Sequence, residues 1–99
     1  MKIMTESIHF TADQKLLHLI ERKLQKLERL YERIIDIKVV LKLENHQTIK
    51  DKIVEILIHV PGGNLFARES SRNFETAIEL ALASLKKQTM RFKGKIQSN

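Results

Sequence analysis

The 99-residue chain contains no cysteine and no tryptophan, and it has only one proline and three glycines. Without cysteine it can form neither a disulfide framework nor a thiolate metal site. No apolar run approaches the roughly 20 residues of a membrane helix, and no apolar signal region follows Lys2. The length suits one domain with one modest core. These absences predict a single, soluble, cytoplasmic domain that does not enter a membrane.

Acidic residues are missing from the last fifth of the chain, because none follows Glu79. Five basic residues do follow it: Lys86, Lys87, Arg91, Lys93 and Lys95. A second cationic excess lies in residues 12–34, and the whole chain has a net charge of +6. A localised cationic surface favours a polyanionic partner. Two ordinary explanations remain open: a solvated helix face, and cations that complement the dipole at a helix C-terminus.

Hydrophobic periodicity predicts an α+β fold with the element order β-α-β-β-β-α. We expect strands at 2–8, 36–43, 53–60 and 64–69, and helices at 12–32 and 73–94. Residues 2–8 are expected at a sheet edge, and 53–60 inside the sheet because both of its faces carry apolar residues. A polar loop is expected at 44–51 and a tight hairpin turn at 61–63, where proline and glycine supply the required dihedral angles. The simplest architecture is a four-stranded sheet with both helices packed on one face.

Polar residues mark the expected helix ends. Thr11 with Gln14 fits a capping box for the first helix, and Asn73 fits the N-cap of the second. Gly94 is expected to end the second helix. The folded domain is therefore predicted to span 1–95, and 96–99 to be a short stub.

The first predicted helix has sorted charges. At about 100° per residue, its basic side chains fall within a stripe of roughly 60° opposite the apolar face. These residues are Lys15, Arg22, Lys26, Arg29 and Arg33. Together with the basic end of the last helix, the stripe predicts two cationic ridges on the same side of the molecule.

The histidines, at positions 9, 18, 46 and 59, show no helical metal-binding spacing, and the chain has no phosphate-cradling glycine loop. We therefore expect no enzymatic activity, no catalytic residues, no metal, no cofactor and no small-molecule substrate. Two alternatives stay open. One is a small ribonuclease that uses His46 and His59, and the other is a general module for double-stranded RNA.

Several segments together resemble the ribosome hibernation promoting factors and ribosome-associated inhibitors of the sigma-54 modulation, or S30EA, type. The similar segments are Lys23-Leu24-Gln25-Lys26-Leu27-Glu28, Val60-Pro61-Gly62-Gly63-Asn64-Leu65-Phe66-Ala67, Asn73-Phe74-Glu75-Thr76-Ala77-Ile78-Glu79, Leu85-Lys86-Lys87-Gln88 and Arg91-Phe92-Lys93-Gly94-Lys95. They occur in the family's order over nearly the whole chain. The length resembles the family's short form.

This resemblance implies a factor that binds the small (30S) ribosomal subunit through 16S rRNA, over the mRNA and tRNA sites. Such factors silence translation in stationary or stressed cells and promote inactive 70S and 100S ribosomes. The resemblance implies rRNA contacts by Lys23, Lys26, Lys87, Arg91, Lys93 and Lys95. The helical projection adds Arg22, Arg29 and Arg33, and the basic C-terminal segment adds Lys86. Away from the ribosome we expect a monomer.

Overall fold

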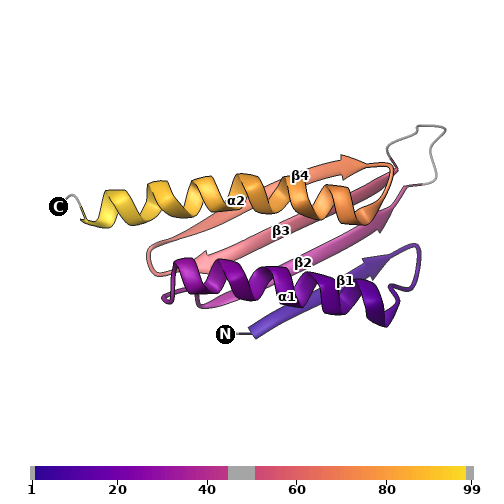
Figure 1. The fold of residues 1–99 in the computed structure, drawn as a ribbon, viewed down its shortest axis with the longest axis horizontal. Helices are drawn as coiled ribbons and strands as arrows, with labels where there is room; N and C mark the ends of the chain where they lie inside the picture. Colours follow the sequence, from indigo (N-terminus) through magenta and orange to yellow (C-terminus); the bar gives the residue numbers. More distant parts are fainter. Residues whose placement is uncertain (1, 45–50, 98–99) are drawn as a thin grey trace.

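The computed structural model describes residues 2–44 and 51–97, which form a layer of sheet and a layer of helix (Figure 1). The elements in chain order are β1 (Lys2–Ile8), α1 (Gln14–Leu30), β2 (Asp36–Leu43), β3 (Lys52–Val60), β4 (Gly63–Ser71) and α2 (Phe74–Gln97). The predicted α+β class and the order β-α-β-β-β-α are confirmed. β4 is a little longer than the segment predicted at 64–69.

The strands lie in the sheet in the order β1-β2-β3-β4. β1 and β2 are parallel because α1 returns the chain to the end of the sheet at which β1 begins (Figure 1). The other pairs are antiparallel, with Ile37 opposite Ile58 and Ile58 opposite Leu65. β1 is an edge strand in which no residue is buried, and β3 lies inside the sheet. Both placements confirm the predictions.

The hydrophobic core lies between the sheet and the two helices, which cover the same sheet face (Figure 1). Strand residues with no exposed surface form its floor: Ile37, Val39, Leu41, Val54, Ile56 and Ile58. The helices add Ile20, Leu24, Leu27, Ala77, Ile78, Ala81 and Leu85. The small side chains of Ala77 and Ala81 let α2 pack closely on β3 and β4. Burial of this apolar surface is the main force that fixes the helices on the sheet.

The two helices run in the same direction, and α2 extends past the end of the sheet (Figure 1). Aromatic contacts join the two helical regions near both ends. Phe10 stacks on Phe74 with ring centroids 4.8 Å apart, and Tyr31 and Phe92 form a T-shaped pair with centroids 5.8 Å apart. The C-terminal ends of both helices, with their basic residues, therefore lie at the same end of the molecule.

The predicted cap of the first helix is wrong. Asp13, not Thr11, is the N-cap of α1, and its Oδ1 accepts a hydrogen bond of 2.8 Å from the amide of Leu16. A carboxylate at this position also interacts favourably with the helix dipole. The helix ends at Leu30 rather than near residue 32. For α2 the predicted cap is confirmed, since Asn73 Oδ1 accepts from the amide of Thr76 at 2.8 Å.

The end predicted for the second helix is also wrong, because α2 continues through Gly94 to Gln97. Glycine inside a helix costs only about 1 kcal/mol relative to alanine, so it weakens the last turn without ending it. The predicted stub at 96–99 thus begins within the helix, and residues 98–99 lie outside the described chain.

The predicted hairpin joins β3 to β4, and Val60 pairs with Gly63 across it. Gly62 takes the positive φ of 85° that the turn requires. Of the loop predicted at 44–51, only Glu44 and Asp51 lie within the described residues; the Glu44 amide donates to the Asp51 carbonyl at 3.0 Å. Over the described ranges, neither helix combines the length and apolar character needed to cross a membrane.

Candidate nucleic-acid interface

Most of the predicted binding residues lie on the helix layer, and most of them are exposed. α1 carries Arg22, Lys23, Lys26 and Arg29, and α2 carries Lys86, Lys87, Arg91, Lys93 and Lys95. Arg33 is exposed but does not lie on α1, because that helix ends three residues earlier. α1 therefore carries four of the five residues predicted for the basic stripe.

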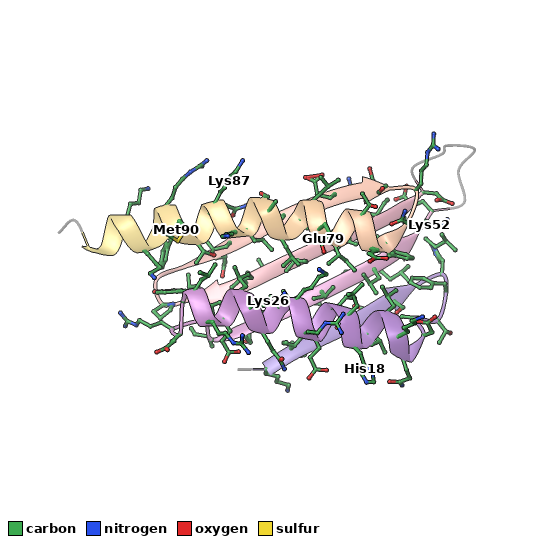
Figure 2. The ribbon with its side chains drawn as sticks, viewed as in Figure 1. His18, Lys26, Lys52, Glu79, Lys87 and Met90 are labelled. Carbon is green, nitrogen blue, oxygen red and sulfur yellow. The ribbon has the colours of Figure 1, made fainter. Side chains whose placement is uncertain are left out.

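Three of these lysines surround a groove between the helices. Lys23 and Lys26 border it from α1, and Lys86 borders it from α2. The other lining residues are Leu27, Leu30, Glu79, Leu82 and Ala83. Figure 2 labels Lys26 and Glu79 on the two helices that form the walls. The groove of about 390 Å³ thus combines an apolar floor with a rim of three cations and one carboxylate.

Two lysines of the predicted set tie the helices together. Lys23 Nζ on α1 forms a salt bridge with Glu79 Oε1 on α2. Lys93 Nζ on α2 donates a hydrogen bond of 2.8 Å to the carbonyl oxygen of Leu30, the last residue of α1. The last carbonyls of a helix have no partner within the helix, so a cation at this point satisfies one of them and matches the dipole. Both side chains are partly buried and help to position α1 relative to α2.

Lys87 and Arg91 are one helical turn apart on α2 and are exposed. Figure 2 shows Lys87 extending from α2 on the side away from α1. Between these two positions, Gln88 turns toward the free edge of β4. Its amide nitrogen donates to the carbonyl of Phe66 at 2.7 Å, and its oxygen accepts from the amide of Phe66 at 3.2 Å. This pairing fixes the segment of α2 that carries Lys87 and Arg91.

The predicted α1 stripe does not face a single hollow. Arg22 borders a depression with Lys15, His18 and Glu75 near the start of the helices. Arg29 borders another one, beside β1, which also includes Glu21 and Glu28. The structure therefore brings Lys23, Lys26 and Lys86 together and places Arg22, Arg29, Lys87 and Arg91 around them on the helix layer.

Charge on the opposite, open face of the sheet is partly paired. Glu55 binds both Lys42, at 3.4 Å, and Arg68, at 3.1 Å. His59 contacts Asp36. At the start of β3, Lys52 donates to Asp51 at 2.9 Å, and this hydrogen bond, opposed by partial desolvation, lowers the pKa of the Asp51 carboxyl. Glu55 and Asp36 thus pair with three basic residues of this face, whereas the exposed strand residues Lys2 and Lys38 have no salt bridge among the described residues.

The helix layer carries more unpaired cations than the open sheet face. Within residues 2–44 and 51–97, seven predicted cations have neither a salt bridge nor a side-chain hydrogen bond: Arg22, Lys26, Arg29, Arg33, Lys86, Lys87 and Arg91. Their charge is available to an external partner. Cations held on two packed helices keep a fixed spacing and release counterions when they bind phosphates.

The described residues contain no group of three histidine, aspartate or glutamate side chains placed to hold a metal. His59 contacts Asp36 on the open sheet face. His46, the other histidine of the ribonuclease alternative, lies outside the described residues. The arrangement that is described supports binding of a polyanion.

Two contributors to this surface were not predicted from the sequence. In the sequence, Glu79 stands out only as the last acidic residue, and Gln88 only as part of a family-like segment. The spacing of Ser84 and Gln88 could have placed both on one side of α2, where they hydrogen-bond each other at 3.1 Å. That Gln88 also meets the backbone of β4 depends on how the helix packs on the sheet.

Comparison with known proteins agrees with the resemblance noted in the sequence. The family profile described as sigma 54 modulation protein / S30EA ribosomal protein matches residues 3–97. A ribosome hibernation promoting factor of Salmonella typhimurium is 32% identical over 80 residues, which are 81% of this chain and 80% of that protein.

Two solved structures share the fold. A ribosomal subunit interface protein from Coxiella burnetii superposes with a TM-score of 0.85 at 22% identity, covering 95% of this chain and 99% of the other. The N-terminal domain of Thermus thermophilus Protein Y superposes with a TM-score of 0.79 at 28% identity, covering 93% of this chain and 99% of the other.

Proposed function

This chain belongs to the sigma 54 modulation protein / S30EA ribosomal protein family, and from that membership we propose that it is a ribosome hibernation factor. It binds the small ribosomal subunit through 16S rRNA, in the channel that mRNA and tRNA occupy. By filling this channel it inhibits translation and promotes inactive 70S and 100S ribosomes in stationary or stressed cells. It acts in the cytoplasm as a monomer until it binds, and residues 1–95 hold the ribosome-binding domain.

The observation that carries this proposal is the concentration of unpaired cations on the helix side. Acidic neighbours pair Lys42 and Arg68 on the open sheet face, and only Lys2 and Lys38 among the cations of the described strands have no partner. Seven cations of the described helix side have none. A rigid, one-sided array of this kind fits folded RNA, which proteins recognise largely through its shape and backbone. The name of the Salmonella relative, a ribosome hibernation promoting factor, supports the ribosome as the source of that RNA.

The proposed rRNA contacts divide into two groups by their surroundings. Direct phosphate contacts are assigned to the exposed cations Arg22, Lys26, Arg29, Arg33, Lys86, Lys87, Arg91 and Lys95. Lys23 and Lys93 are assigned mainly to positioning, because each already joins α1 to α2. This function requires tight, shape-matched binding and no bond-making chemistry.

Cosedimentation of the purified protein with separated ribosomal subunits tests the proposal. We expect it to pellet with small subunits and not with large ones, and to be released as salt rises, because each phosphate contact releases counterions. Addition of the protein to a cell-free translation reaction should lower protein synthesis. Equal binding to both subunits, or displacement by plain duplex RNA at the same concentration as by small subunits, would instead favour a general RNA-binding module.

A further inference from the structure

The groove between α1 and α2 has features that phosphate binding does not require. Its floor is formed by Leu27, Leu30 and Leu82, and its rim carries a carboxylate as well as lysines. A purely electrostatic surface for RNA gains nothing from an apolar floor or from a negative charge. We infer that this groove takes one unpaired nucleotide of the bound RNA and prefers a base with an amino group on its Watson–Crick edge, such as cytosine or guanine, over uracil. The inference rests on the proposed function and deepens it.

Different parts of the groove suit the base and the phosphate of a nucleotide. The leucines offer a surface against which the face of an unstacked base can lose water, and sequence-specific RNA recognition targets such splayed-out bases. Lys26 and Lys86 are exposed and unpaired within the described chain, and they stand on opposite walls. Their ammonium groups can hold the phosphate of the same nucleotide or of its neighbour.

Glu79 supplies the base preference. Its side chain is 53% exposed, and Oε1 is the oxygen that contacts Lys23, so Oε2 remains available as an acceptor. A carboxylate accepts hydrogen bonds from the amino group of cytosine, and the amino and imino protons of guanine offer the same kind of donor. The Watson–Crick edge of uracil offers one imino proton, and the carbonyl oxygens on both sides of that proton are repelled by a carboxylate. Glu79 should therefore select for amino-bearing bases and against uracil.

The groove is formed before RNA arrives. The Lys23–Glu79 bridge crosses it, and the Lys93–Leu30 hydrogen bond closes the gap between the helices at one end. Stacking of Phe10 on Phe74 holds the other end. Because the groove is preformed, little free energy is lost in ordering it when a ligand binds. A single nucleotide can therefore contribute a measurable base preference.

Fluorescence anisotropy with dye-labelled oligoribonucleotides, eight cytidines against eight uridines, tests the preference. We expect the full chain to bind the cytidine oligomer about tenfold more tightly, the discrimination that one good base contact gives. Glu79→Ala should weaken cytidine binding and leave uridine binding equal or tighter, so that the preference disappears. Equal affinities in the unmodified protein, or an equal gain for both oligomers in Glu79→Ala, would show that Glu79 only repels phosphate and would overturn the inference.

A second variant tests whether the base enters the groove. Ala83→Tyr fills the groove without changing charge, and it should weaken binding of the cytidine oligomer at least fivefold. Leu80→Tyr is the matched control, because Leu80 is exposed on α2 and does not line the groove. If Ala83→Tyr and Leu80→Tyr bind alike, no base enters. Parallel cosedimentation separates the two proposals: small-subunit binding without a base preference rejects only the groove, and a base preference without subunit binding rejects only the ribosomal function.

Discussion

Lys93 Nζ lies 2.8 Å from the carbonyl oxygen of Leu30, so a residue of the predicted RNA-binding set closes the C-terminal end of the neighbouring helix. Lys87, six residues earlier on the same helix, is exposed and has no protein partner among the described residues. Two lysines that look alike in the sequence therefore differ in role. Lys93 contributes to the packing of the helices, and Lys87 is available to bind RNA.

Stability should separate these two lysines. Lys93→Met should lower the free energy of unfolding by about 1 kcal/mol, because the Leu30 carbonyl loses a charged donor at a partly buried site. Lys87→Met, the matched control, should change it by less than about 0.5 kcal/mol. Urea unfolding followed by circular dichroism measures both. Equal stabilities for the two variants would show that the Lys93 contact has no structural role.

The Gln88 side chain should protect the Phe66 amide, at the free edge of β4, from hydrogen exchange. Gln88→Ala removes both hydrogen bonds to the main chain of Phe66 and should cost about 1–2 kcal/mol of unfolding free energy. It should also speed hydrogen exchange at the Phe66 amide, which NMR can follow residue by residue. Gln25→Ala, at an exposed position on α1, is the control and should leave that amide as protected as before. Unchanged protection in Gln88→Ala would contradict the assigned pairing.

Tyr31 has a buried hydroxyl with no hydrogen-bond partner among the described residues, although its ring packs against Phe92. Tyr31→Phe keeps the ring and removes the unpaired group. The free energy of unfolding should stay the same or rise by up to about 1 kcal/mol, since an unsatisfied buried hydroxyl is costly. Tyr31→Ala, which removes the ring as well, should cost about 3 kcal/mol or more. A clear loss of thermal stability in Tyr31→Phe would mean that the hydroxyl has a partner.

The pKa of Asp51 should depend on Lys52. The hydrogen bond from Lys52 Nζ lowers this pKa below its ordinary value of 3.8, against an opposing effect of desolvation. Lys52→Met should therefore raise it, as an NMR titration of the Asp51 carboxyl would show, while Lys38→Met should not. Because the folded-state pKa is the lower one, the stabilising effect is present above the ordinary pKa and is lost as the pH falls through the depressed one. An Asp51 titration identical in both variants would refute the pairing.

The element order could be predicted because local patterns determine it. Alternating apolar residues mark β2 and β3, and proline with glycine marks the hairpin between β3 and β4. The errors occur at helix ends, where the residue type alone does not decide the boundary. Thr11 and Asp13 can both cap a helix, and only the path of the chain after β1 decides for Asp13. Gly94 is a common helix terminator, but nothing requires the chain to turn there, so α2 continues.

The candidate site could be predicted only in outline. Helical projection finds which side of each helix is basic, but it cannot show which cations the fold itself occupies. Lys23 and Lys93 are joined to Glu79 and Leu30 across the helix interface, and these contacts depend on the parallel packing of α1 and α2. The groove beside Lys26 and Lys86 has the same origin, because its walls come from segments about 60 residues apart.

We propose that the unpaired cations of the helix layer, and not those of the sheet, bind the small ribosomal subunit. The most direct test compares two double variants with the same change of charge in a small-subunit cosedimentation assay over a range of salt. Lys87→Glu/Arg91→Glu reverses two helix cations, and Lys2→Glu/Lys38→Glu reverses two exposed cations of the sheet. Circular dichroism first confirms that both variants fold.

We predict that the helix variant loses subunit binding at salt concentrations where the unmodified protein still pellets. For any binding that remains, the plot of log affinity against log salt concentration should have a shallower slope. The change in slope should correspond to the loss of about two phosphate contacts. The sheet variant should bind with nearly the unmodified affinity and salt dependence. If the helix variant binds normally, or if both variants lose binding equally, the account of the helix layer as the ribosome-binding surface is wrong.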